Sequence, residues 1–266
     1  MTSRWVRLGD GVFARRYAEL DLTVGLVVGE RLALVIDTRG DEVQGAELAG
    51  AVREKTRLPL AAALTHAHFD HCFGTAAFGP LPVFAHRACP SWLRATAEAQ
   101  RAEWTEYYRS TGDQATAAAL ADAQVVFPDH PVDEYAELDL GGRTVRLVHP
   151  GAGHTNHDLA VYVPDADVLF AGDLVEQGAP PDFSDADPLR WPGAVSALLE
   201  LSPTTVVPGH GSPVSPDFVA AQRAELASVA ELCLAVRAGE LVSAEAERHG
   251  PYPPETIRAA LLAVTR

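Results

Sequence analysis

His66-Ala67-His68-Phe69-Asp70-His71 places four ionisable side chains within six residues, directly after the apolar run from Leu60 to Leu64. The run predicts a buried strand, and the strand therefore ends in a loop rich in imidazole and carboxylate. A second short strand is expected from Pro82 to Ala85, after a helical segment. Strand, loop, helix and strand together form a unit that places ligands at strand ends.

The spacing within this stretch indicates metal binding. On an extended segment, residues two apart project to the same side, so His66 and His68 can present two imidazoles to one ion. Asp70 and His71 face a second point as the chain turns into helix. Neutral imidazole and carboxylate suit zinc, iron or manganese, because the set lacks thiolate and has few hard oxygens. The alternative, a solvated histidine cluster, is disfavoured because the cluster follows an apolar strand directly.

Three further candidates stand where a predicted strand gives way to a glycine-bearing loop. They are Gly153-His154-Thr155, Gly172-Asp173-Leu174 and Gly209-His210-Gly211. Glycine beside a ligand lets backbone approach closely, and the preceding strand holds the ligand rigid. Taken alone, each of these three motifs fits a capped turn as well as it fits a metal ligand. Together with the first cluster they complete a set of seven candidate metal ligands.

The rest of the chain alternates strands with helices. Residues 91–124 carry a helical composition with interleaved aromatic side chains and predict two helices inserted between strands. Residues 176–192 predict a long loop, and the chain beyond Ser215 predicts helices broken at Gly239 and at 250–254. The other predicted strands are 22–28, 31–37, 135–140, 144–148, 159–163, 168–171 and 204–207, and the other predicted helices are 43–56 and 191–201.

Composition bounds the class of protein. The 266 residues are 47% hydrophobic and 21% charged, which is enough to bury a core. Lysine and arginine total 21 against 36 aspartates and glutamates, a net charge of −15 that disfavours nucleic acid and anionic membranes as partners and leaves a small-molecule substrate. Residues Met1 to Asp10 lack an apolar signal core, so a cytoplasmic location is expected. Three scattered cysteines suggest neither a disulfide framework nor a thiolate zinc site.

These motifs resemble those of the metallo-β-lactamase superfamily, and the resemblance covers nearly everything from Leu22 to Ser215. It implies an α/β fold of the α+β kind, a four-layer αββα sandwich with metals at one edge of the two sheets. We expect one metallo-β-lactamase-like domain over residues 1–214, with the helical insertion at 91–124. Residues 215–266 are expected to form a helical extension packed on that domain.

The resemblance also implies a role for each candidate side chain. His66, His68 and His154 would bind the first metal ion. Asp70, His71 and His210 would bind the second. Asp173 would bridge both ions, and Asp37, which closes an early strand, would orient a ligand from behind. The resemblance implies two divalent metal ions. Zinc is the first expectation, and manganese and iron are the alternatives.

The function that follows is hydrolysis. Two divalent ions that share a water lower its pKa towards about 7 and supply a hydroxide that attacks an ester, thioester, lactone or amide. Asp70 is a candidate for moving the proton to the leaving group. The alternative is a mono-iron dioxygenase of the persulfide type on the same fold, with iron held by His66, His68 and either Asp173 or His154. The acidic charge disfavours a nuclease.

Several other residues carry weaker signals. His157, three residues beyond His154, is a candidate for substrate contact or for support of a ligand. The aromatic residues of the insertion are interpreted as either helix packing or a wall that covers the site and sets substrate shape. The acidic residues Glu176, Asp182, Asp185 and Asp187 are interpreted as a solvated loop. The remaining histidines, His86, His130, His149 and His249, are expected to be ordinary hydrogen-bonded or solvated groups.

Overall fold

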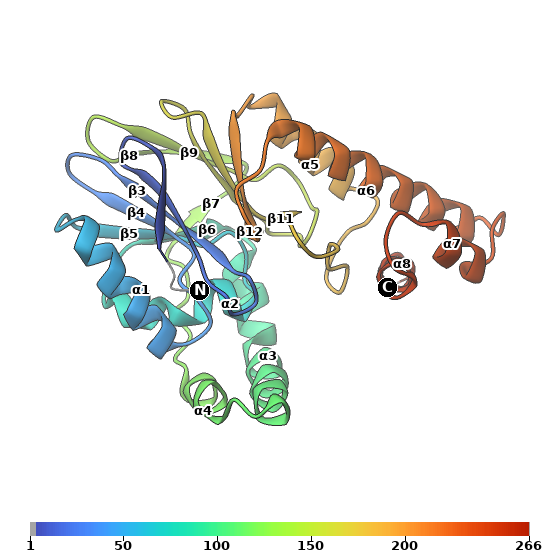
Figure 1. Ribbon diagram of the computed structural model, residues 1–266, viewed down its shortest axis with the longest axis horizontal. Coiled ribbons are helices and arrows are strands. Elements are labelled where there is room, and N and C mark those ends of the chain that lie inside the picture. Colours follow the sequence, from blue (N-terminus) through green and yellow to red (C-terminus); the bar gives the residue numbers. More distant parts are fainter. Residues whose placement is uncertain (1–3, 266) are drawn as a thin grey trace.

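The computed structural model describes residues 4–265, so the first three residues of the Met1–Asp10 stretch lie outside it. Two β-sheets pack face to face and helices cover both outer faces, which gives four layers in the order αββα (Figure 1). The predicted fold class is therefore confirmed. In residues 4–265, none of the helices combines the length and the apolar character that crossing a bilayer requires.

The first sheet has seven strands in the order of the chain. Antiparallel pairing joins its first four strands, and parallel pairing joins β4 to β7. The strands are β1 (Trp5–Gly9), β2 (Val12–Arg16), β3 (Thr23–Val28), β4 (Ala33–Ile36), β5 (Leu60–Ala63), β6 (Val83–His86) and β7 (His130–Val132).

The second sheet has five strands in the order β12-β11-β10-β9-β8. Its strands are antiparallel except for β11 and β12, which pair in parallel. They are β8 (Tyr135–Asp139), β9 (Thr144–Val148), β10 (Ala160–Val163), β11 (Val168–Glu176) and β12 (Thr205–His210).

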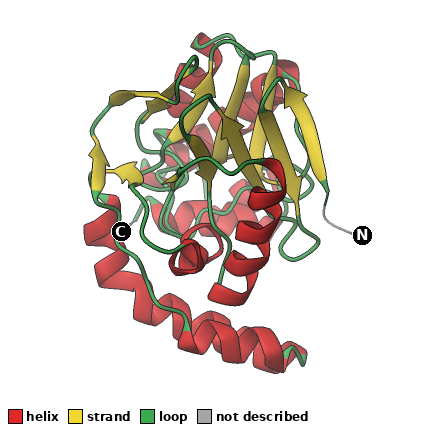
Figure 2. Cartoon of the chain, turned by 90° about the vertical axis from the view of Figure 1, so that its left-hand side faces the viewer, coloured by secondary structure: helices red, strands yellow, loops and turns green. Residues whose placement is uncertain are grey.

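The helices fall into two groups, one for each sheet. Figure 2 shows helices packed beneath the strands of the first sheet, and Figure 1 shows the C-terminal helices on the side of the second. The first group comprises α1 (Glu42–Lys55), α2 (Phe69–Cys72), the 3-10 helix η1 (Phe73–Phe78), α3 (Cys89–Thr111) and α4 (Gln114–Asp122). The second comprises α5 (Trp191–Glu200), α6 (Pro216–Arg237), α7 (Ser243–His249) and α8 (Pro254–Ala263).

Apolar side chains from both sheets fill the space between them. Leu34 and Ile36 of the first sheet belong to one buried cluster with Val161 and Phe170 of the second. At about 25 cal/mol per Å² of apolar surface, burying each such side chain stabilises the fold by roughly 1.5 to 3 kcal/mol. This cluster holds the two sheets, and with them the two halves of the site, in fixed register.

The C-terminal helices share a core with the outer face of the second sheet. Leu226 of α6 and Ile257 of α8 are buried in the same cluster as Leu169 of β11 and Trp191 of α5. The indole N–H of Trp191 also donates to the carbonyl of Leu174 at 3.0 Å. The chain after residue 214 thus continues the hydrophobic layer that supports β11.

The structure departs from the sequence predictions at four strands. Strands β1, β2 and β7 were not predicted, because each is at most five residues long and is interrupted by arginine, histidine or proline. Strand β11 runs to Glu176, five residues beyond its predicted end, with register shifts around Gly172. Glu176 is therefore a buried strand residue, and its interpretation as part of a solvated loop was wrong.

The two sheets are also joined at their edge by polar contacts. Leu22 and His210 form an isolated antiparallel bridge. Beside it, the amide of Gly211 donates to the carbonyl of Asp21 at 2.8 Å, and the Thr23 hydroxyl donates to the carbonyl of Gly211 at 2.5 Å. These contacts bring the segment before β3 against the end of β12.

A glycine pair sets the distance between α1 and η1. A Cβ at Gly45 would lie 2.3 Å from the carbonyl oxygen of Gly74, whereas a Cβ at Gly50 on the same helix would meet nothing within 4 Å. We therefore expect Gly45→Ala to lower the free energy of unfolding by about 1 to 3 kcal/mol through overpacking. Gly50→Ala, the matched control, should raise it by about 0.5 to 1 kcal/mol through helix propensity. Urea unfolding of both variants measures the difference, and equal effects would contradict the close-approach argument.

Candidate metal centre

The candidate ligands converge from both sheets onto one edge of the sandwich. His66 and His68 follow the carboxyl end of β5, and α2 carries Asp70 and His71. His154 lies in the loop between β9 and β10, Asp173 lies within β11, and His210 ends β12. Each of the seven residues predicted as ligands therefore lies in the carboxyl-terminal half of a strand or in the loop or helix that follows one, which is where α/β proteins place their sites.

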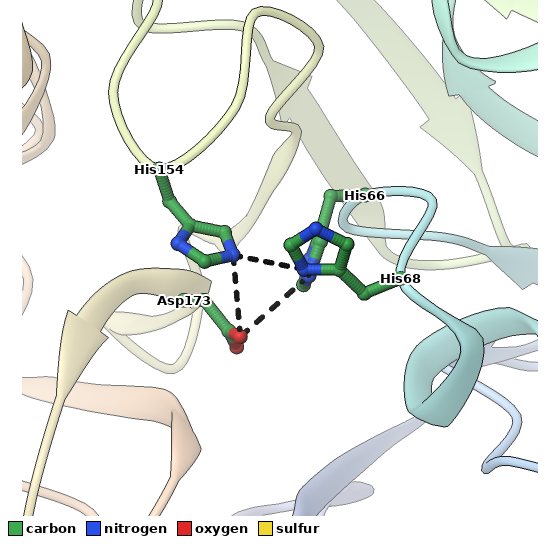
Figure 3. Close-up of side chains that lie close together, drawn as sticks. All are labelled: His66, His68, His154 and Asp173. Atoms are coloured by element: carbon green, nitrogen blue, oxygen red, sulfur yellow. Dashed lines mark hydrogen bonds and ion pairs between the residues drawn. The ribbon is translucent and has the colours of Figure 1, made fainter. Parts of the chain in front are cut away.

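Four of the seven form a first group of metal-ligating atoms within 4.8 Å of one another: His66, His68, His154 and Asp173. Figure 3 shows the three imidazoles and the carboxylate turned toward a common point. His68 Nδ1 lies 3.0 Å from both His66 Nε2 and His154 Nε2. Asp173 Oδ2 lies 3.6 Å from the same two Nε2 atoms.

Asp70, His71 and His210 form a second group. The Nε2 atoms of His71 and His210 lie 3.3 Å apart, and Asp70 Oδ2 lies 3.6 Å from the first and 3.4 Å from the second. Asp173 adjoins this group too, with Oδ1 3.3 Å from His71 Nε2 and Oδ2 3.3 Å from His210 Nε2. One carboxylate therefore faces both groups.

Each candidate histidine has one ring nitrogen that faces a donor group, the inner nitrogen, and one that faces away from it, the outer nitrogen. Hydrogen bonds to the outer nitrogens fix which nitrogen points inward. His71 Nδ1 donates to Asp37 Oδ2 at 2.8 Å. His210 Nδ1 donates to the carbonyl of Leu20 at 2.7 Å, and His154 Nδ1 faces the carbonyl of Asp182 at 3.3 Å. Because carbonyls and carboxylates only accept, each outer nitrogen carries a proton, and in the neutral ring the inner Nε2 is the atom that offers a lone pair.

The other two histidines obey the same rule. His68 Nε2 donates to Asp185 Oδ2 at 3.2 Å, which leaves Nδ1 as the inner atom. The Thr65 hydroxyl donates to Asp37 Oδ2 at 2.8 Å and so accepts from His66 Nδ1 at 3.1 Å. The inner nitrogens of the five imidazoles thus face the centres of the two groups. In metal sites, a hydrogen-bond partner behind each ring produces this arrangement.

The inward-pointing atoms of the two groups do not satisfy one another's hydrogen-bonding capacity. With its proton on Nε2, His68 Nδ1 cannot donate to either ring nitrogen that lies 3.0 Å away. Asp173 Oδ1 is buried and makes no hydrogen bond within residues 4–265. Buried lone pairs that face one another are costly unless a cation lies between them. The residues present therefore fit metal ions at both groups.

The electrostatics of the two groups differ. Burial, with the neighbouring His71, lowers the pKa of His66 well below its usual range, and burial lowers that of His154 to about 4, so both rings are neutral. Burial opposes the charged form of His210 as well, but the carboxylates of Asp173, Asp70 and Glu176 outweigh it and raise the pKa to about 10. The second group thus favours a positive charge, which either a proton on His210 Nε2 or a bound cation supplies.

Asp37 ties the ligands of the first sheet together. Its Oδ1 accepts from the amide of Thr65 at 2.8 Å, while its Oδ2 accepts from both the Thr65 hydroxyl and His71 Nδ1. The residue is 1% exposed and has a left-handed backbone with φ 61°. Such a conformation is uncommon for a residue with a side chain and persists where the surroundings fix it. Asp37 therefore lies behind the candidate ligands His66 and His71, bonded to His71 directly and to His66 through Thr65.

His157 lies behind the site. Its ring is fully buried, and Nε2 accepts from the amide of Ala67 at 3.2 Å. This contact supports the segment between His66 and His68, so the geometry favours support of ligands over contact with substrate. Burial lowers its pKa to about 3, which keeps the ring neutral and able to accept.

The other histidines lie outside the two groups. His86 and His149 stack on each other with ring centroids 4.0 Å apart. His130 pairs with Asp129, and His249 is exposed at the end of α7. None of these four belongs to a cluster of potential metal ligands within residues 4–265.

A cavity of about 870 Å³ opens onto the two groups, a size that suits a small molecule. The helical insertion contributes Gln100 and Trp104 to its wall, and Trp104 stacks on Phe69 with ring centroids 4.5 Å apart. Tyr108, in contrast, is 6% exposed and belongs to the core beneath the first sheet. The insertion therefore lines the site through Trp104, whereas Tyr108 is packing.

Sequence reasoning missed several participants. Thr65 precedes the motif and could have been found from its position at the strand end. The carbonyls of Leu20 and Asp182 carry no side-chain signal, because any residue supplies a carbonyl. Asp185 was assigned to a solvated loop, yet it contacts His68. Gly209 is also constrained, since a Cβ there would lie 1.8 Å from Asp173 Oδ1.

Comparison with known proteins gives concordant matches. Residues 20–210 match the family model of the metallo-beta-lactamase superfamily. The chain is 28% identical to the human acyl-coenzyme A thioesterase MBLAC2, over 76% of this chain and 79% of that protein. It is 26% identical to a type 2 metallo-beta-lactamase of Bacteroides fragilis, over 39% of this chain and only 43% of that protein.

The fold comparison agrees. A crystal structure of a metallo-beta-lactamase from Hirschia baltica superposes with a TM-score of 0.67 at 17% identity, covering 84% of this chain and 97% of that one. At 17% sequence identity, this structural similarity is evidence for the shared fold alone.

The hydrogen bonds of Asp37 lead to a test of metal affinity. Asp37→Asn places an amide where one carboxylate accepts three hydrogen bonds, so the affinity for zinc should fall by about 10- to 100-fold. Asp41→Asn is the matched control, because Asp41 is equally buried but only caps α1, a role that asparagine also fills. Zinc titration against a competing chelator measures both variants. Unchanged affinity in Asp37→Asn would show that Asp37 does not orient the ligands.

Proposed function

Because the chain belongs to the metallo-β-lactamase superfamily, we propose that it is a metal-dependent hydrolase of small molecules. It uses two metal ions, for which zinc is the first candidate. The bond that it cleaves is that of an ester, thioester, lactone or amide. One observation carries the proposal. The carboxylate of Asp173 faces two groups of inward-pointing donor atoms, 3.3 to 3.6 Å from their ring nitrogens. A mononuclear site would need only one of these groups.

The donors divide between the ions as the two groups suggest. His66, His68 and His154 hold the first, Asp70, His71 and His210 hold the second, and Asp173 bridges them. When bound, such ions supply a Lewis acid and, by lowering the pKa of water, a nucleophile at neutral pH. Imidazole and carboxylate donors also bind manganese and iron, so the donor set restricts the metal to zinc, manganese or iron and does not distinguish among them.

The chain's own residues position the reaction. Outer hydrogen bonds hold each imidazole in one orientation, so little reorganisation accompanies turnover. Asp70 is 8% exposed and lines the cavity, so its carboxylate can reach a bound substrate and is the candidate to carry a proton to the leaving group. Trp104 and Phe69 supply an apolar wall that reduces the access of water.

The competing function, oxygen activation at a single iron, is less well supported. It would use three donors of the first group and leave Asp70, His71 and His210 without a role. The second group is nevertheless assembled, and its carboxylates raise the pKa of His210 to about 10. A site with this much negative charge favours a second cation.

Metal content tests the proposal directly. Protein purified after expression in zinc- or manganese-supplemented medium should hold about two metal ions per chain, because two complete donor groups are present. Elemental analysis by mass spectrometry gives the ratio. A reproducible value of one iron per chain with no second metal, accompanied by oxygen uptake, would replace the hydrolase with the dioxygenase.

The bridging role of Asp173 has its own test. Asp173→Asn removes one negative charge from between the two groups, so hydrolysis should fall by more than about 100-fold, beyond the usual effect of losing a supporting residue. The melting temperature of the metal-free protein should change much less than the rate. Near-normal hydrolysis of a thioester and lactone panel, with two metals bound, would show that Asp173 is not the bridge.

A further inference from the structure

The helical insertion contacts the metal centre through Gln100 of α3. This side chain is half-buried, and its amide bonds to the main chain on both sides of His68. Its Oε1 accepts from the amide of Phe69 at 2.9 Å, and its Nε2 donates to the carbonyl of Ala67 at 3.1 Å. A main-chain amide only donates and a carbonyl only accepts, so the two bonds fix the orientation of the Gln100 side chain.

These bonds satisfy main-chain groups that the local fold leaves without partners. Phe69 begins α2, so its amide has no acceptor within the helix. Ala67 lies between β5 and α2, and its amide is bound by His157 Nε2, as described above. Side chains from two segments that are distant in sequence therefore hold the stretch of chain that carries His68.

Gln100 lines the cavity, yet its N–H groups are already used within the protein. Besides the bond to Ala67, Nε2 donates to the Thr96 hydroxyl at 3.2 Å, and that hydroxyl donates to the carbonyl of Trp92 at 3.0 Å. A glutamine amide has two N–H donors, so none is left for a substrate. The geometry therefore suits Gln100 to position the ligand segment and not to bind the substrate.

Gln100 belongs to a stripe of α3 that faces this segment. The stripe repeats every fourth residue from Trp92 to Trp104, so its members lie on neighbouring turns of one helix face. Trp92 contacts the ring of His68 edge to face, with centroids 5.5 Å apart, and Trp104 stacks on Phe69. The helix thus contacts the ligand segment through two aromatic rings and one amide.

His68 is the candidate imidazole of the first group that packing fixes least. Its side chain is 17% exposed, whereas those of His66 and His154 are each 1% exposed. Burial holds the other two rings, while the position of His68 depends more on its main chain and on the contact with Asp185. A residue that holds this main chain therefore acts on the first group.

We propose that Gln100 is a positioning residue for the first metal ion, which acts by holding the main chain on both sides of His68. The inference rests on the two-metal site of the proposed hydrolase, and it assigns part of that site's support to the helical insertion. The affinity for one of the two ions should thus depend on a side chain that belongs to neither donor group. Supporting residues of this kind change metal affinity by about 10- to 100-fold.

Gln100→Met tests the inference, because methionine has a similar length and helix propensity but cannot reproduce the hydrogen bonds of the amide. Zinc titration of the metal-free protein against a competing chelator should show one ion bound about tenfold more weakly and the other almost unchanged. Gln114→Met is the matched control. Gln114 belongs to the same insertion, is exposed and does not line the cavity, so its replacement should leave both zinc affinities at the wild-type value.

A double-mutant cycle shows whether Gln100 acts through His68. In the His68→Ala background, Gln100→Met should cost no further zinc affinity, because the ligand that it positions is already absent. In the His210→Ala background, which leaves the first group complete, the tenfold loss of affinity should persist. A purely structural role would instead weaken zinc binding by the same factor in both backgrounds. Melting temperatures of the metal-free variants give the accompanying change in stability.

The outcomes separate the inference from the proposed function. Unchanged zinc affinity in Gln100→Met, or an equal loss in the His68→Ala background, would overturn the inference. If Gln100→Met does not fold, Gln100→Glu takes its place with the same expected loss, since glutamate turns an oxygen toward the Ala67 carbonyl. Failure to hydrolyse any substrate would count against the hydrolase alone, because zinc affinity is measured without turnover. A protein that binds a single ion would contradict the two-metal site, and the same cycle would then decide the inference on that ion.

Discussion

The metal centre depends on one constraint: every candidate imidazole ligand is held by its outer nitrogen. The acceptors are of three kinds, namely carboxylates at Asp37 and Asp185, a hydroxyl at Thr65, and main-chain carbonyls at Leu20 and Asp182. Each hydrogen bond fixes a tautomer as well as a direction, so the lone pairs converge without any ligand having to reorient. The strands around the site serve to keep these acceptors in place.

This constraint explains why the two sheets must be fixed relative to each other. Four candidate ligands come from the first sheet and its helix α2, and three come from the second, so neither sheet alone supplies either group of donor atoms. The shared core, with Ile36 facing the second sheet and Phe170 facing the first, sets the separation. Bound cations would join the sheets at their edge as well, and binding energy would then add to folding energy.

The sequence was informative where function is concentrated in side chains. The stretch from His66 to His71, with His154, Asp173 and His210, indicated the superfamily and its αββα fold, because imidazoles and carboxylates at strand ends have few structural uses. Prediction failed where tertiary packing decides. Strand β1 has little apolar periodicity and forms because it pairs with β2. Glu176 looked like loop because polar and proline-rich residues follow it, whereas the parallel pairing with β12 extends β11 that far.

The bridge between Leu22 and His210 has a consequence for the order of assembly. His210 and the carbonyl that it contacts are separated by 190 residues of chain. During synthesis, the segment before β3 is made early, and its partner appears only after β12 has left the ribosome. Contacts this distant in sequence form late, because the chain between them must first be ordered. The first sheet can therefore fold before the second group of candidate donors is complete, because that group lacks His210 until β12 docks beside Asp70 and His71.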